Sequence, residues 1–224
     1  KTLKISKNVI KSEFRKQIDD TDYFPREIQT YIKSNMNEMI TYNVKINGKN
    51  VVLNFYIDGL DKHGLDNKSL YKTFIIIYVL TLYSSKRCSK HLIIDIFLTP
   101  FKRMLPKNVN DIIKPINVNG GYTYGGCNNS NKITIYREEE WFKVLIHELF
   151  HNLDLDFSTM NIDKCRERMI NIFGIKSEYN IYETYCETWA RILNVAVVSF
   201  LNTLDKTKRE FLQNFDKLMK KEQI

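Results

Sequence analysis

Two of the four histidines in this 224-residue chain lie in one short segment, Ile146–His151, which reads IHELFH. Residues four apart on an α-helix are separated by about 40° of rotation and about 6 Å of rise, so His147 and His151 would project from one face. Imidazole nitrogens that converge in this way suit zinc, which proteins bind in a tetrahedral shell. Glu148 follows as in the HExxH pattern, where the glutamate takes a proton from the attacking water and passes one to the leaving amine. The segment predicts a zinc site with His147 and His151 as ligands and Glu148 as the catalytic base.

The alternative interpretation is that these histidines are ordinary core residues. The surrounding run EEEWFKVLIHELFHNL is apolar over a wide face, so its helix is expected to be mostly buried. Two imidazoles and a carboxylate on such a helix would all need buried polar partners, and one metal ion supplies them at once. The zinc interpretation is therefore favoured.

A catalytic zinc site needs a third protein ligand, because such sites use three and leave one position for water. The extended pattern HExxHxxGxxH does not apply, since Asp154 and Phe157 stand where its glycine and third histidine would be. Downstream, YNIYETYCETWARILN places Glu183 and Glu187 one helical turn apart on one face. One of them could bind the ion while the other accepts the free N–H of a ligating histidine. The weaker candidates are His63, His91, Asp154 and Asp156.

An HExxH segment followed by a helical glutamate resembles the gluzincin group of zinc metallopeptidases, the thermolysin-like arrangement and its small relatives. In several of these the second helix reads as a glutamate, a small residue three later, an acidic or amide residue four later, then an aromatic residue and often alanine. The residues in that order here are Glu183, Cys186, Glu187, Trp189 and Ala190. The run ETYCETW is similar to that of the anthrax lethal factor type of zincin. The resemblance covers about residues 133–194 and implies Glu183 as third ligand, with Glu187 steadying a ligating histidine.

The donor that would stabilise the oxyanion is where this chain departs from the family. Lethal-factor-like enzymes carry a tyrosine seven residues before the third ligand, and that place is Lys176 here. The candidates are therefore Tyr122, Tyr124, Tyr179 and Tyr182. The run IYREEEWFKVLIHE is also similar to predicted metallopeptidases of large DNA viruses.

The elements that position these residues follow from the spacing of apolar residues. Helical spacing predicts helices over residues 7–18, 25–40, 70–84, 138–153, 162–173 and 179–204, and a tail helix that carries residues 211–219. Alternating runs joined by Asn47-Gly48 predict a hairpin over residues 42–57. Two further strands are expected at residues 91–99 and 132–137. Between them NGGYTYGG lacks the pattern of a phosphate loop and is interpreted as a rim or edge strand.

These elements predict a single α+β domain over residues 1–224. Residues 1–130 would form the scaffold and the rim of a cleft, and residues 131–224 would supply the metal-site helices. The resemblance implies a zincin-like fold, in which a small mixed sheet backs the HExxH helix and the C-terminal part is mainly helical. It also implies that the strand KITIYR or the rim GGYTYGG lines the cleft as an edge to which an extended peptide can pair.

The composition is that of a globular chain with a basic surface. Apolar residues make up 43% and charged residues 27%, and no apolar run is long enough to span a membrane. The net charge of +8 is scattered along the chain and favours acidic substrate segments. No nucleic-acid-binding motif occurs, so nucleic acid is not an expected partner. The sequence predicts no oligomeric state.

The spacing of the cysteines gives an indication of the cellular compartment. Cys88, Cys127, Cys165 and Cys186 lie far apart without a CxxC pair. This spacing fits reduced thiols better than a disulfide framework or a cysteine-based zinc site. The first residues, KTLKISKNVIKSEF, lack the apolar core of a secretory signal, although a signal removed earlier would leave no trace. The expected location is therefore intracellular and cytoplasmic.

The predicted function is that of a zinc-dependent peptidase that acts on a protein or peptide. One alternative is an inactive zinc-bearing relative whose cleft binds a partner protein. A weaker one is a basic nucleic-acid-binding protein in which the histidine pair is a coincidence.

Overall fold

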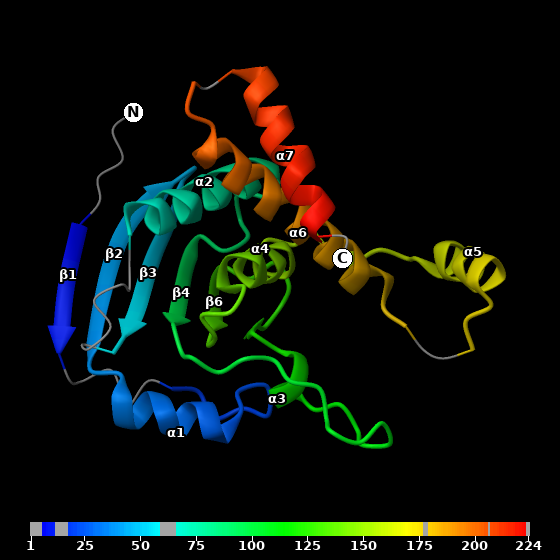
Figure 1. The fold of residues 1–224 in the computed structure, drawn as a ribbon, viewed down its shortest axis with the longest axis horizontal. Coiled ribbons are helices and arrows are strands. Elements are labelled where there is room, and N and C mark those ends of the chain that lie inside the picture. The colour runs from blue at the N-terminus through cyan, green and yellow to red at the C-terminus, as the bar shows by residue number, and fades with distance from the viewer. Residues whose placement is uncertain (1–5, 12–17, 59–65, 177–178, 206, 223–224) are drawn as a thin grey trace.

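The computed structural model describes residues 6–11, 18–58, 66–176, 179–205 and 207–222, and it is an α+β fold built on one mixed sheet (Figure 1). The strand order in the sheet is β1-β2-β3-β4-β6-β5. The strands are β1 (Ser6–Lys11), β2 (Glu38–Ile46), β3 (Lys49–Ile57), β4 (His91–Phe97), β5 (Gly121–Thr123) and β6 (Ser130–Ile135). The helices are α1 (Arg26–Asn35), α2 (Asn67–Tyr83), α3 (Pro115–Val118), α4 (Trp141–Asn152), α5 (Asp163–Phe173), α6 (Ile181–Asn202) and α7 (Lys208–Glu222).

The sheet is antiparallel at its two ends and parallel in the middle. The β2–β3 hairpin turns through Asn47 and Gly48, whose φ angles of 47° and 83° suit the two-residue turn that the sequence predicts. β3, β4 and β6 are parallel to one another, and α2 connects β3 to β4. β5 pairs antiparallel with β6 and forms the edge of the sheet. The expected hairpin and both expected strands are confirmed.

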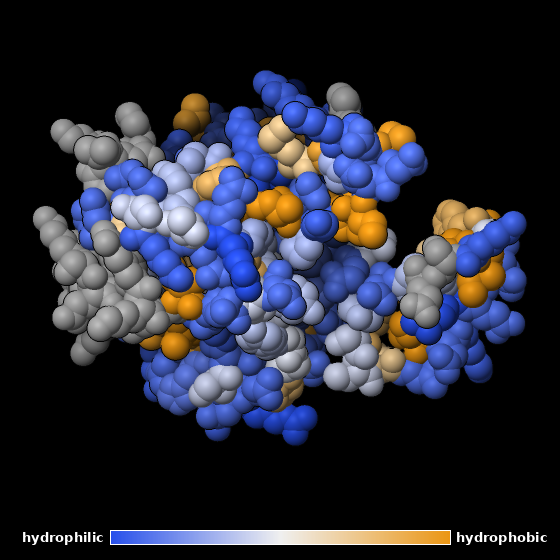
Figure 2. Space-filling view, turned by 90° about the horizontal axis from the view of Figure 1, so that it is seen from below, coloured by the Kyte–Doolittle hydropathy of each residue, from blue (hydrophilic) through white to orange (hydrophobic). Residues whose placement is uncertain are grey.

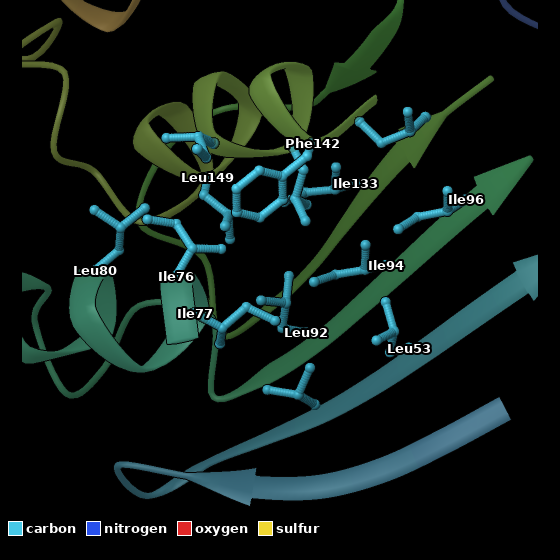
Figure 3. Packing of buried hydrophobic residues seen from close by; sticks show 14 of the residues in the cluster. Leu53, Ile76, Ile77, Leu80, Leu92, Ile94, Ile96, Ile133, Phe142 and Leu149 are labelled. Carbon is cyan, nitrogen blue, oxygen red and sulfur yellow. The ribbon is translucent and has the colours of Figure 1, made fainter. Parts of the chain in front are cut away.

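The main core lies between the sheet and the layer formed by α2, α4 and α6 (Figure 3). Alternate residues of β4 point toward this layer, namely Leu92, Ile94 and Ile96, and all three are fully buried. Leu149 of α4 and Ile77 of α2 meet them from the other side. Burying one such side chain contributes about 1.5–3 kcal/mol. The helix that carries the histidines is therefore fixed to the sheet along its whole apolar face.

A second core covers the opposite face of the sheet. There α1 packs Ile28, Ile32 and other apolar side chains against Tyr56 and Tyr136. This face also carries a buried carboxylate, Asp95, which accepts a hydrogen bond from Asn54 and is paired with Lys132. The sheet is thus covered by helices on both faces, and its β5 edge lies beside α4.

Three expected helix boundaries are wrong. Residues 7–11 of the expected helix over residues 7–18 belong to β1, because they pair antiparallel with β2, and residues 12–17 lie outside the described part of the chain. The helix that follows Pro25 ends at Asn35, since Met39 and Ile40 belong to β2. The run of glutamates before Trp141 precedes α4 and does not form its first turn. The other expected helices are confirmed within a few residues of their predicted ends.

The cysteines contradict the expectation of four reduced thiols. Cys88 and Cys127 form a disulfide, whereas Cys165 and Cys186 are free. The two bonded residues precede β4 and follow β5, and the sheet brings these two segments together, which no local spacing reveals. Because disulfides are rare in reducing compartments, the cysteines no longer support the intracellular location. In the described residues no helix is both long and apolar enough to cross a membrane.

α5 stands apart from the rest of the molecule (Figure 1). None of its residues is buried, and Ile172 and Phe173 are exposed. Gly174, at a φ of 58°, ends the helix as the sequence predicts. In the space-filling view apolar side chains gather on the lobe that this segment forms (Figure 2). α5 is thus an arm between the helix that carries the histidines and the helix that carries the glutamates.

Candidate metal centre

The candidate site lies where α4 meets α6. α4 turns Leu145 and Leu149 into the main core, and its opposite side presents His147 and His151, which are half-buried. His151 faces Glu183, near the start of α6, and Lys143 faces Glu187, one turn further along that helix. The two helices therefore run antiparallel. This packing brings together residues that lie more than 30 positions apart in the sequence.

Three ligand-type atoms converge at the centre of this contact. His147 Nε2 and His151 Nε2 are 3.0 Å apart, and Glu183 Oε2 lies 3.2 Å from the first and 3.5 Å from the second. Ligands at about 2.0–2.1 Å from a tetrahedral zinc ion are separated by about 3.3 Å. The spacing of the three atoms therefore fits a zinc ion bound between them.

His151 is held in the tautomer that a metal site requires. Its Nδ1 lies 2.7 Å from Asp156 Oδ2, and an ionised carboxylate can only accept, so Nδ1 carries the proton. In neutral imidazole the other nitrogen, Nε2, then carries a lone pair, and it faces the centre of the site. The second oxygen of Asp156 accepts from the backbone N–H of Ser158 at 3.1 Å and from its hydroxyl at 2.7 Å.

A second carboxylate, that of Glu187, lies beside His147. Glu187 Oε2 lies 3.5 Å from His147 Nδ1, the outer limit of a hydrogen bond. Within the described residues this buried Nδ1 has no hydrogen-bond partner of ordinary geometry, so Glu187 is the acceptor toward which a small movement would bring it. With the proton on Nδ1, Nε2 of His147 also turns a lone pair to the centre. Two lone pairs and a carboxylate then face one another and require a cation between them.

The pKa values of the site residues also indicate that a positive charge is needed between the ligands. Burial by itself lowers the pKa of both histidines, but hydrogen bonds to carboxylates outweigh it. The pKa of His147 rises to about 9, mainly through Glu183 and Glu187, and that of His151 to about 12, mainly through Asp156. When both imidazoles are protonated, the hydrogen bonds from their Nε2 atoms hold the pKa of Glu183 well below its usual range. Either protons on the imidazoles or a metal ion between the ligands would balance the charge of these carboxylates.

Glu148 is buried next to His147 and is not one of the three residues whose ligand atoms converge. Burial raises the pKa of its carboxyl to about 7, which is suited to a group that must both take up and release a proton. The backbone N–H of Thr123 in β5 donates a hydrogen bond to this carboxylate. The proposed base is thus positioned by the edge strand.

The cluster opens into a cavity of about 750 Å³. Its wall includes β5, where a Cβ atom on Gly121 would meet Ile135 and the Thr134 carbonyl of β6 at 2.8 Å and Val144 of α4 at 3.0 Å. Only glycine fits this approach, so the glycines of the rim bring the edge strand against the helix. The expectation that GGYTYGG forms an edge strand is confirmed, and β5 lines the cavity.

The four tyrosines differ in their access to the cavity. Tyr182 lines it, with its ring centroid 6.4 Å from that of His151. Tyr122 also lines it, but its hydroxyl donates to Asp19. Tyr179 donates to the Arg166 carbonyl, and neither Tyr179 nor Tyr124 lines the cavity. Among these candidates Tyr182 is the one placed to reach a bound substrate.

The weaker candidates for the third ligand lie elsewhere or have other partners. His63 lies outside the described residues. His91 is exposed at the start of β4, beside Asn50. Asp154 is close to the Cys88–Cys127 disulfide, and Asp156 contacts Nδ1 of His151 on the side away from the other ligand atoms.

Two residues of the site have roles that the sequence did not reveal. Asp156 follows the end of α4 and returns to His151 only because Asp154 adopts a left-handed conformation with a φ of 59°. Lys143 is buried beside Glu187. The spacing of Lys143, four residues before His147, is a signal that could have indicated a shared face.

The fold and site define an α+β protein with a candidate metal centre between two helices. No protein-family model, curated protein or solved structure matches this chain.

Proposed function

We propose that this protein is a zinc-dependent peptidase with a zincin-like fold, in which His147, His151 and Glu183 bind the metal and Glu148 is the general base. The observation that carries the proposal is the convergence of the two Nε2 atoms and Glu183 Oε2 within 3.0–3.5 Å of one another. This arrangement agrees with the resemblance to the gluzincins, which implies the same three ligands. When bound there, zinc would polarise a carbonyl group and lower the pKa of water.

The chain's own residues supply the rest of the chemistry. Glu148 takes a proton from the attacking water onto its carboxylate, and the N–H of Thr123 keeps that carboxylate in place. A peptide paired with the edge of β5 that lines the cavity would lie beside these groups. Tyr182 is the proposed donor to the developing oxyanion. The preference for acidic substrates remains a prediction from net charge, because both cations in the cavity wall, Arg103 and Lys143, are paired with glutamates.

Metal content is the first test. Purified wild type should contain one zinc per chain by elemental mass spectrometry. Zinc should be lost in His147→Ala and in Glu183→Ala, and it should be retained, though more weakly, in Glu187→Ala. Wild type without zinc would refute the proposal and leave the protonated histidine pair as the explanation of the cluster.

Turnover is the second test, and it separates a peptidase from an inactive zinc-bearing module. Glu148→Gln should retain zinc, because the residue is not one of the proposed ligands, and should lose peptide cleavage, because an amide cannot take up the proton. The glutamine oxygen can still accept from the N–H of Thr123, so the fold is preserved. Full activity in purified Glu148→Gln would exclude this mechanism. A peptide library that zinc-loaded wild type never cleaves would instead favour the binding module.

A further inference from the structure

Two stripes of side chains face each other where α4 packs on α6. The α4 stripe is Lys143, His147 and His151, and the α6 stripe is Glu183, Glu187 and Arg191, each with a spacing of four residues. The helices are antiparallel, so the proposed ligands occupy one level of the contact and the Lys143–Glu187 pair occupies the next level outward. The proposed function uses the first level only.

Lys143 is buried, although lysine is almost never buried without a partner. Its side chain is 5% exposed, and Nζ lies 3.0 Å from Glu187 Oε1 and 3.1 Å from Glu140 Oε2. Glu140 is also paired with Arg103. A buried ammonium group is costly unless carboxylates pair with it, so a lysine at this place contributes little through packing alone. Its partners hold Nζ at one position beside the metal centre.

Glu187 connects Lys143 to the proposed ligands. Its Oε1 accepts from Lys143 Nζ and from Arg191 Nε, each at 3.0 Å, while Oε2 lies 3.5 Å from His147 Nδ1. With Oε1 held in this way, Oε2 remains directed at the histidine. The Arg191 side chain is 45% exposed, so water can replace its contact, whereas the buried contact of Lys143 has no such substitute.

His151 is held by a carboxylate in the same way, with one oxygen at the histidine and the other at a second partner. Asp156 Oδ2 accepts a hydrogen bond from His151 Nδ1, and its Oδ1 accepts from the N–H and the hydroxyl of Ser158. Each orienting carboxylate thus uses one oxygen for a histidine and the other for an anchor. Lys143 is the anchor on the His147 side, as Ser158 is on the His151 side.

We propose that Lys143 is a positioning residue of the metal centre, which fixes Glu187 as the hydrogen-bond acceptor of His147 and thereby leaves Glu183 as the carboxylate that faces the ion. This inference rests on the proposed function, because it requires a metal ion between His147 and His151. Lys143 acts through Glu187 and is not one of the proposed metal ligands. Loss of an outer partner of this kind typically weakens metal binding by about 10-fold to 100-fold.

The test is a double-mutant cycle on zinc affinity, with the free ion set by a chelator and the full chain used throughout. The variants are Lys143→Met, Glu187→Gln and the combination of the two. Lys143→Met alone should weaken zinc binding roughly tenfold. In the Glu187→Gln background, Lys143→Met should cause no further loss of zinc affinity, because the residue through which Lys143 acts is already altered. A purely structural role for Lys143 would give additive losses.

Matched controls separate a specific effect of Lys143 on zinc affinity from a general loss of charge or of folding. Lys220→Met removes the same charge from an exposed pair on α7 and should leave zinc affinity unchanged. Unfolding of the metal-free variants shows whether Lys143→Met folds, and Lys143→Arg, which keeps the cation, replaces it if it does not and should retain affinity within about threefold. Additive losses, or no loss in Lys143→Met, would overturn the inference while the proposed function stands. Absence of zinc from wild type would overturn both.

Discussion

Asp156 reaches back from beyond the end of α4 to place Oδ2 2.7 Å from Nδ1 of His151. α4 ends at Asn152, and the left-handed residue Asp154 reverses the chain so that the carboxylate faces the helix it has just left. The pairing fixes which nitrogen of His151 is free for a metal. An acidic residue outside the HExxH segment is therefore part of the site.

Asp156→Ala should weaken zinc binding by about 10-fold to 100-fold, because His151 would lose the acceptor that sets its tautomer and orientation. The measurement is chelator competition on the purified variant. Asp163→Ala, at the exposed start of α5, is the control and should bind zinc as wild type does. An unchanged affinity in Asp156→Ala would mean that the fold alone orients His151.

Tyr182→Phe should lower kcat by about 100-fold to 1,000-fold, the usual cost of losing one oxyanion donor, with KM and zinc content little changed. The measurement is steady-state cleavage of a peptide that wild type hydrolyses. Tyr179→Phe is the matched control, since its hydroxyl is already used by the Arg166 carbonyl. If the two variants retain equal activity, the oxyanion donor is another group in the cavity wall.

Removal of the disulfide should destabilise the fold. Cys88 and Cys127 are 39 residues apart, and closing a loop of that size contributes about 4 kcal/mol by the chain-entropy model. Urea unfolding of the double variant Cys88→Ser/Cys127→Ser should show the loss, and wild type should show a similar loss under reducing conditions. Cys165→Ser changes an exposed free thiol and should unfold as wild type does. Equal unfolding midpoints for oxidised and reduced wild type would contradict this prediction.

The N-cap residue of α2, Asp66, should stabilise the fold in a pH-dependent way. Asp66 accepts a hydrogen bond from the N–H of Ser69 at 2.7 Å, and the side chain and the N–H of Ser69 together lower the pKa of the carboxyl. A pKa that is lower in the folded state means that the contribution is complete above the unfolded value of about 4 and is lost as the pH falls through the folded value. Asp66→Ala should therefore cost about 1 kcal/mol near pH 7 and much less near pH 2, measured by urea unfolding.

The control for the cap is Asp66→Asn, which keeps an acceptor but does not titrate at this position. It should retain most of the stability at neutral pH and show a smaller change on acidification than wild type. An identical acid response in wild type and Asp66→Asn would assign the pH dependence to other carboxylates.

The parts of the fold that the sequence predicts are those determined by neighbours in the chain. The β2–β3 hairpin follows from Asn47-Gly48 and alternating apolar residues, and α4 follows from its apolar face. β1 could not be predicted, because residues 6–11 are a strand only through pairing with β2. Met39 and Ile40 likewise continue a helical pattern in sequence but are taken up by the sheet. In both cases tertiary pairing outweighs local propensity.

The same distinction holds within the candidate site. His147, Glu148 and His151 share one helix, so their spacing alone predicts that they group together. The resemblance to the gluzincins is what implies Glu183. The contacts of Lys143 with Glu187 and of Thr123 with Glu148 join separate elements. The choice of Tyr182 among four tyrosines needs the cavity wall. These relationships depend on how α4 meets α6 and β5, and sequence periodicity carries no information on that.

The exposed arm α5 should unfold locally more easily than the rest of the molecule. A helix without a single buried residue has almost no tertiary contact to protect its amide hydrogens, so they should exchange with solvent far sooner than those of α4. Lys164, Arg166 and Arg168 lie on this arm, which makes it a natural point of attack for trypsin. A chain cut there would become two fragments that remain associated through the α4–α6 contact, so limited digestion would nick the protein without dispersing it.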